Sequence, residues 1–264
     1  MIIRADARHL PLVDGCVDCI VTSPPYFGGV RDYGHDAQIG LEREPSAYVD
    51  SLVHVFRECG RVLVPDGVLW LNLGDVYAAS GKGGGGIRGA RTKSWASIRD
   101  RKGSRMPPAG FKFKDITLTP FLVADALRRD GWYLRSTIVW SKPVATEPPR
   151  LDRPSSAHEY LFLLTRAEQS RVRNPGESWW FSTVWHMSPD ASSEHQATMP
   201  SELVRRCIVS SCGIGGLVLD PFLGNGTVGA VAERMGRRWV GTDLSYQPLA
   251  KKRTAQRGIQ FEAL

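Results

Sequence analysis

The sequence has no apolar run near the roughly 18 to 20 residues that a membrane-spanning helix needs. Its amino terminus also lacks the basic and then apolar pattern of a signal segment. We therefore expect a soluble, cytoplasmic protein with no membrane partner. Its 264 residues, 42% of them hydrophobic, are enough for one full core, so a single domain over 1–264 is the simplest expectation.

Cysteine is scarce and its spacing is uninformative. Five cysteines are an odd number, which argues against a disulfide framework. Cys16 and Cys19 form a Cys-x-x-Cys pair, but Cys207 and Cys212 do not supply a second one. We expect buried thiols and no metal site.

The most informative stretch is Thr-Ser-Pro-Pro-Tyr at 22–26, which follows an apolar run typical of a buried strand. Two prolines remove two backbone donors, so they end sheet pairing and leave a rigid turn. This turn presents the Ser23 hydroxyl, the Pro24 carbonyl and the Tyr26 ring. Two acceptors and a stacking face suit a flat ring that carries an amine, such as a nucleobase lifted out of its duplex.

A second motif lies near the carboxyl end of the chain. A short apolar strand ends at Asp220, and the Gly-rich turn Pro-Phe-Leu-Gly-Asn-Gly-Thr at 221–227 leads into helical spacing. Strand, Gly-rich turn and helix form the nucleotide-binding corner of many α/β sheets. The next strand ends at Asp243, whose carboxylate can accept hydrogen bonds from both ribose hydroxyls. Because Asp220 favours a cation over a pyrophosphate, S-adenosylmethionine fits better than a dinucleotide.

Ser-Pro-Pro-Tyr at 23–26 resembles motif IV of the amino-group DNA methyltransferases. Asp-Pro-Phe-Leu-Gly-Asn-Gly-Thr at 220–227 resembles their motif I, where serine usually stands in place of Asn225. The target loop precedes the cofactor loop, as in the beta-type, circularly permuted members. The resemblance implies a Rossmann-like α/β methyltransferase sheet, mostly parallel with an antiparallel edge hairpin, and double-stranded DNA as substrate.

The resemblance extends over most of the chain. Segments 69–75, 131–143 and 153–160 resemble the strand after motif IV, the late hairpin and the segment that follows it. Residues 195–200 resemble motif X, with Met199 where an aromatic residue is usual. The implied catalytic residues are Ser23, Pro24, Pro25 and Tyr26. The implied contacts to S-adenosylmethionine are Asp6, Thr198, Met199, Pro200, Asp220, Pro221, Phe222, Gly224, Asn225, Gly226, Thr227 and Asp243.

Acidic residues are almost absent from 80–114, which carries ten Lys and Arg against Asp100 alone. The segment therefore has a net charge of +9, and the rest of the chain has −2, which together give the chain's +7. The segment contains four consecutive glycines and has no helical or strand periodicity, so it is expected to be a flexible insertion. It is either a solvated loop or an arm that orders on the phosphate backbone, and we favour the arm. Its candidate DNA contacts are Lys82, Arg88, Arg91, Lys93, Arg99, Arg101, Lys102 and Arg105.

Sequence recognition is expected in the short interval 144–194 and in the basic arm. The interval contains arginines and the Trp179–Trp180 pair; arginine can read guanine edges or contact phosphates. Lys142, Arg171 and Arg173 are further candidate DNA contacts. The target sequence, a partner restriction endonuclease and the oligomeric state (monomer or homodimer) are left open by the sequence.

Hydrophobic periodicity predicts alternating strands and helices and hence a mainly parallel sheet. The expected strands are 2–4, 17–21, 68–73, 132–140, 159–165, 217–220 and 238–242. The expected helices are 46–63, 119–129, 201–211, 228–234 and 248–257.

The exocyclic N4 amine of cytosine is the favoured target, because N4-cytosine members of the family mostly carry serine at the position of Ser23. N6-adenine methylation is the alternative. No cysteine follows a proline, which disfavours the carbon-5 route. A dinucleotide-dependent oxidoreductase using Asp243 leaves 23–26 and the basic arm unexplained. A silent DNA-binding module needs a broken motif, and we see none. His158 and its neighbour Glu159 are expected to be structural.

Overall fold

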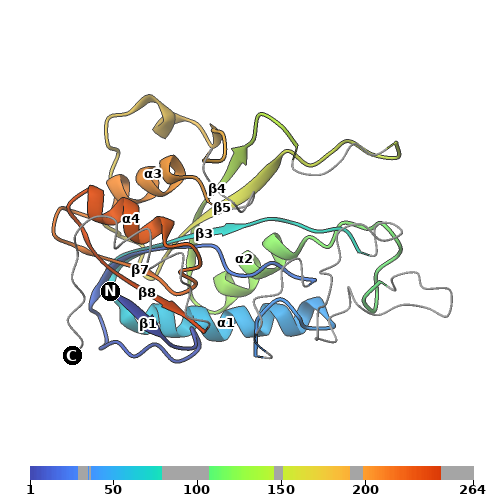
Figure 1. The fold of residues 1–264 in the computed structure, drawn as a ribbon, viewed down its shortest axis with the longest axis horizontal. Coiled ribbons are helices and arrows are strands. Elements are labelled where there is room, and N and C mark those ends of the chain that lie inside the picture. Colours follow the sequence, from blue (N-terminus) through green and yellow to red (C-terminus); the bar gives the residue numbers. More distant parts are fainter. Residues whose placement is uncertain (29–34, 36, 79–106, 146–150, 191–198, 245–264) are drawn as a thin grey trace.

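An eight-stranded mixed sheet forms the centre of the protein, in the order β1-β8-β7-β2-β3-β5-β4-β6 (Figure 1). The computed structural model describes residues 1–28, 35, 37–78, 107–145, 151–190 and 199–244. The strands are β1 (Ile2–Arg4), β2 (Val17–Thr22), β3 (Leu63–Leu73), β4 (Tyr133–Ser141), β5 (His158–Thr165), β6 (Val184–His186), β7 (Leu217–Asp220) and β8 (Arg238–Asp243).

The strands from β1 to β3 in this order are all parallel, and β5 is antiparallel to both β3 and β4. The predicted parallel sheet and antiparallel hairpin are therefore confirmed. One detail differs: the short strand β6 pairs in parallel with β4 and is the outermost strand. Only its middle residue, Trp185, is buried, so three residues give no periodicity that a sequence pattern could detect.

Two pairs of helices cover the sheet, one pair on each face (Figure 1). Helices α1 (Pro45–Val62) and α2 (Thr119–Arg129) pack on one face, and α3 (Ser201–Ser211) and α4 (Thr227–Arg234) pack on the other. A 3-10 turn spans Ser178–Phe181. Helices 119–129 and 201–211 have the predicted bounds, whereas the helix expected at 248–257 lies outside the described residues.

Strand β3 shows how one apolar run serves two cores. Its side chains alternate between faces, so Leu69 and Leu71 enter the core under α1 and α2, while Val68 and Trp70 enter the core under α3 and α4. All four are fully buried. A continuous apolar run is the pattern of a strand covered on both faces.

The order of connections indicates where a ligand would bind. From β2 the chain crosses through α1 to its neighbour β3, and from β7 it crosses through α4 to β8 on the other side. Adjacent strands β2 and β7 therefore form the topological switch point, and the loops after their carboxyl ends diverge at the place where open α/β sheets bind their ligands. The end of β4 and the start of β5 reach the same edge, since Ser141 pairs with His158 and Leu73 with Tyr160.

No described helix is long and apolar enough to cross a membrane. The five cysteines are free thiols, and four of them are buried. Burial raises the pKa of the Cys212 thiol to about 11. In the described part of the chain, no group of three or more His, Cys, Asp or Glu is placed to hold a metal ion.

Candidate active site

The loop Ser23–Tyr26 follows β2 directly and is held from two sides. The Tyr26 ring lies against Gly74 at the end of β3, where an added Cβ would come within 2.6 Å of the ring. From α1, the Tyr48 hydroxyl donates a hydrogen bond of 3.0 Å to the Pro25 carbonyl. The rigid turn that the two prolines predict is thus packed between strand and helix.

The Tyr26 hydroxyl lies in a polar network at this edge. It donates to Glu159 Oε2 at 2.5 Å, and Ser23 Oγ donates to the Tyr26 oxygen at 3.5 Å. Burial, and then the charge of Glu159, raise the pKa of Tyr26 well above its ordinary value. The phenol therefore stays protonated at neutral pH.

Lys142 lies behind this network and not on the surface. Its Nζ pairs with Glu159 Oε1 at 2.5 Å and lies 4.5 Å from the centre of the Trp140 ring. The Lys142 side chain is only 5% exposed. This placement argues against the expected contact of Lys142 with DNA, because its charge is paired with Glu159 inside the fold.

The acid at the end of β7 joins the two loops. Asp220 Oδ1 accepts from Thr22 Oγ1 at 2.7 Å and from the Phe222 amide at 3.1 Å. Asp220 is 4% exposed. Burial raises its pKa to about 7, against the opposing hydrogen bonds from Thr22 and Phe222 and with a further rise from the charge of Asp243. The target loop and the cofactor loop therefore share one buried carboxyl.

The Gly-rich loop has the geometry that a close ligand requires. Gly224 and Gly226 have φ of 49° and 74°, a backbone conformation that favours glycine. Gly226 is the N-cap of α4, whose first amides face the loop. At the end of β8, Asp243 Oδ2 accepts from the Gly224 amide at 3.1 Å. The carboxylate predicted to bind ribose thus also fixes the loop.

The other expected cofactor contacts are placed with differing support. Thr242 donates to the Pro221 carbonyl at 2.9 Å. Phe222 and Met199 are partly buried against the two cores, while Pro200 is the N-cap of α3. Asn225 is half-buried in the loop, and Thr227 begins α4. Thr198 lies outside the described residues.

Asp6 lies where the sequence places it, just after β1 and beside the end of β8, since the Ala5 amide bonds the Asp243 carbonyl. Its carboxylate is engaged by Arg8 at 2.6 Å. Burial raises the pKa of Asp6, but the hydrogen bonds and charge of Arg8 outweigh burial and lower it overall. Its contact with S-adenosylmethionine stays a prediction.

These residues pass a test of fit for S-adenosylmethionine. The ligand is a cation with a ribose and an adenine, and this edge of the sheet offers one buried carboxyl, one carboxylate at a strand end and a helix N-terminus behind a glycine loop. Among the described residues, the partners of the Asp220 carboxyl are the Thr22 hydroxyl and the Phe222 amide, and neither is a cation. A bound cation would supply a charged partner.

The residues expected to contact DNA are mostly not among those described. Outside the described residues lie Lys82, Arg88, Arg91, Lys93, Arg99, Arg101, Lys102 and Arg105. Arg171 pairs with Asp18 and, at 2.5 Å, with Asp66, so it anchors its segment to the sheet. The DNA contacts expected of Arg171 and of the exposed Arg173 stay predictions.

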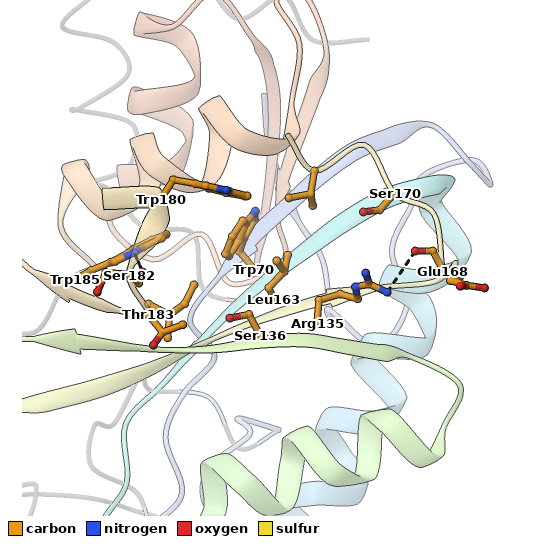
Figure 2. A pocket seen from close by; sticks show the side chains of 12 residues that line it. Trp70, Arg135, Ser136, Leu163, Glu168, Ser170, Trp180, Ser182, Thr183 and Trp185 are labelled. Carbon is orange, nitrogen blue, oxygen red and sulfur yellow. Dashed lines mark hydrogen bonds between the residues drawn. The ribbon is translucent and has the colours of Figure 1, made fainter. Parts of the chain in front are cut away.

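Residues between 168 and 185, within the interval 144–194 that is expected to read sequence, form one wall of a cavity of about 460 Å³ (Figure 2). Trp70, Trp180 and Trp185 line one end of this cavity. At the other end, Arg135 donates to the Glu168 carbonyl at 3.3 Å. Trp179 turns inward instead, with its ring 5.0 Å from that of Trp185. The reading role of the interval stays a prediction.

Sequence reasoning missed three residues of the site. It treated the His158–Glu159 pair as structural, yet Glu159 accepts from Tyr26. It gave no role to Thr22, which reaches Asp220, or to Asn72, whose Oδ1 lies 3.4 Å from the Tyr26 hydroxyl. The sequence offered one signal for Glu159: it is an acid near the start of a predicted strand that reaches the catalytic edge.

Comparison with known proteins settles the family. A family model described as DNA methylase, named for N6 and N4 methyltransferases, matches residues 17–252. The chain belongs to this DNA methylase family. The expectation drawn from the two motifs is confirmed, and the protein is a DNA methyltransferase of the amino-group class.

This DNA methylase is similar to Type II methyltransferases over most of the length of each relative. The Type II methyltransferase M.Cfr9I of Citrobacter freundii is 44% identical over 247 residues, which cover 90% of this chain and 80% of the relative. M.SmaI of Serratia marcescens is 38% identical over 277 residues, which cover 97% and 91%.

Two solved structures share the fold of the methylase. PvuII DNA methyltransferase (cytosine-N4-specific) superposes with a TM-score of 0.70 at 17% identity, covering 100% of this chain and 87% of that one. A putative DNA modification methylase from Thermus thermophilus, solved with S-adenosyl-L-methionine, gives a TM-score of 0.66 at 25% identity, covering 97% and 93%. The methylase family is S-adenosylmethionine-dependent.

Substitution of Asp243 by alanine is expected to weaken cofactor binding before anything else. The change removes a charged hydrogen-bond acceptor and frees the Gly224 amide, so we expect the Kd for S-adenosylmethionine to rise on the order of 10- to 100-fold. Isothermal titration calorimetry measures it. Tyr48→Phe, which removes only the bond to Pro25, is the control and should keep the wild-type Kd. An unchanged Kd in Asp243→Ala would contradict the assignment.

Proposed function

We propose that this DNA methylase transfers a methyl group from S-adenosylmethionine to the exocyclic N4 amine of a cytosine that is flipped out of a specific duplex sequence. The observation that carries the proposal is the bond of 2.7 Å between Thr22 and Asp220. It holds the target loop and the cofactor loop side by side at the switch point of the sheet. Ser23 supports cytosine over adenine, as does the fold shared with an enzyme named cytosine-N4-specific.

The cofactor would be held by residues of the second loop. Asp220 balances its positive charge, Asp243 accepts from the ribose, and the backbone at Gly224 and Gly226 permits close approach. S-adenosylmethionine supplies an electrophilic methyl group when it is bound there. The contacts proposed for Asp6, Met199 and Phe222 cover its adenine side.

The target loop prepares the amine. The lone pair of the exocyclic amine is delocalised into the ring of the base, which makes the amine a poor nucleophile. Ser23 Oγ and the Pro24 carbonyl accept its two hydrogens, favour a pyramidal nitrogen and localise the lone pair. Tyr26 supplies the stacking face. Positioning and fixed dipoles account for the rate, and no covalent bond to the enzyme is required.

The basic arm at 80–114 is proposed to bind the DNA backbone, on the support of its charge alone. The named relatives are Type II methyltransferases, which supports a restriction–modification setting for the protein. A cognate endonuclease that cuts the unmethylated target is proposed as its functional counterpart.

Mass spectrometry of nucleosides from the DNA of expressing cells tests the proposed function. We expect N4-methylcytosine with the wild-type protein and none with Ser23→Ala, which should express and bind cofactor normally. N6-methyladenine instead would keep the mechanism and overturn the base assignment. If neither modified nucleoside is found although the protein is adequately expressed, the proposal is contradicted and a silent DNA-binding module is favoured.

A further inference from the structure

Three side chains from three segments meet behind the target loop: Tyr26 after β2, Glu159 in β5 and Lys142 after β4. The two bonds that Glu159 makes are both 2.5 Å long, and the Glu159 and Lys142 side chains are 12% and 5% exposed. Burying an ion pair brings little net stability, because desolvation offsets the attraction. The presence of this pair at the catalytic edge therefore calls for a reason other than stability.

The chemistry of the groups fixes the direction of each hydrogen bond. The Lys142 ammonium has only donors and occupies Glu159 Oε1, while Glu159 Oε2 can only accept. Tyr26 must therefore donate its proton to Glu159. Asn72 adds a second acceptor on the same side, because its amide nitrogen donates to the Tyr160 carbonyl and its Oδ1 faces the Tyr26 hydroxyl.

The consequence reaches the substrate. With its proton directed at Glu159, the Tyr26 oxygen presents a lone pair towards Ser23, whose hydroxyl donates to it. Because the Ser23 proton is directed at Tyr26, the lone pairs of Ser23 Oγ point away from Tyr26. Those lone pairs are what an incoming amine hydrogen requires.

We propose that Glu159, held by Lys142, is a positioning residue for methyl transfer: it fixes the Tyr26 hydroxyl so that Ser23 meets the target amine as an acceptor. This inference rests on the proposed function of the loop Ser23–Tyr26. Glu159 does not touch the substrate and acts through Tyr26. The same device serves a cytosine or an adenine amine, because both present hydrogens to Ser23.

A double-mutant cycle of Tyr26→Phe and Glu159→Gln tests the inference. Tyr26→Phe keeps the ring and removes the hydroxyl, and Glu159→Gln keeps the shape and puts a donor in the network. Transfer of the tritiated methyl group from S-adenosylmethionine to DNA measures kcat and KM. This assay detects methylation of cytosine and of adenine alike, so the double-mutant cycle can be interpreted even if the cytosine assignment is wrong. Each single variant should lower kcat on the order of 10- to 100-fold, with KM for DNA and Kd for S-adenosylmethionine unchanged.

The double variant decides between positioning and structure. If Glu159 acts through the Tyr26 hydroxyl, the double variant is no slower than the slower single variant. Losses that multiply overturn the proposal, because Glu159 then acts independently of Tyr26. A Glu159→Gln protein without a cooperative melting transition also overturns it, because Glu159 is then required for the fold itself. Wild-type protein with no transfer to any DNA would instead refute the proposed function itself.

Two further variants complete the experiment. Lys142→Met removes the ammonium that holds Glu159, and we expect the same fall in kcat at unchanged Kd; a wild-type kcat overturns the role of Lys142. Asp130→Asn breaks the ion pair of 2.6 Å with Arg57, remote from the catalytic edge, and controls for the loss of a charge pair. Its kcat should equal that of the wild type.

Discussion

Replacing Tyr26 with alanine is expected to lower kcat/KM for DNA roughly 1,000-fold while the Kd for S-adenosylmethionine stays unchanged. A stacked base gains about 1 to 3 kcal/mol from an aromatic face, and loss of alignment at the amine adds a further factor. Cofactor affinity survives because the contacts of Asp220 and Asp243 belong to the other loop. Methyl transfer to DNA and calorimetric titration of the cofactor measure the two effects separately.

The control for this experiment separates the loss of the Tyr26 stacking face from the loosening of the loop that contains it. Removal of the ring leaves a space beside Gly74, so Tyr26→Ala should also melt at a lower temperature. Tyr48→Phe loosens the same loop through Pro25 but keeps the stacking face, and should lose far less activity. Full activity in Tyr26→Ala would show that the target loop is assigned wrongly.

Local patterns made the elements of this fold predictable. Helix α2 begins at a proline-bearing first turn and buries Val123, Ala124 and Leu127, so periodicity gave its bounds. The two loops were recognisable because prolines and glycines restrict the backbone whatever the surroundings. In each case the deciding information lies within about a dozen neighbouring residues.

The parts that sequence could not predict depend on the pairing of distant segments. Thr22 and Asp220 are 198 positions apart and meet only because β2 and β7 are neighbours. A lysine after a strand end usually lies in solvent, and Lys142 is buried only because β5 brings Glu159 to the same edge. Charge alone therefore predicted a DNA contact where the fold makes an ion pair.

Replacing Asp220 with asparagine is expected to stabilise the protein without cofactor and to weaken cofactor binding. An asparagine oxygen still accepts from Thr22 and from the Phe222 amide, so the geometry survives. Burial raises the pKa of Asp220 to about 7 from an ordinary 3.8. Well below pH 3.8 the carboxyl is neutral in both folded and unfolded chains. Between about pH 4 and 7 the unfolded chain ionises while the folded state keeps its proton, so the wild-type protein loses stability over this window, and the loss is complete above pH 7.

The gain from asparagine should therefore be about 2 to 4 kcal/mol at pH 8 and nearly vanish at about pH 3, as a rise of about three pKa units implies. Thermal melting at the two pH values measures it, with Asp130→Asn as the control for a lost carboxylate elsewhere. The Kd for S-adenosylmethionine should rise on the order of 10-fold or more, because the variant offers no charge to the cation. A gain independent of pH would contradict the buried charge, and an unchanged Kd would contradict its role as the cation's partner. Both effects together would mean that the chain accepts a less stable free state because Asp220 is needed for the cofactor.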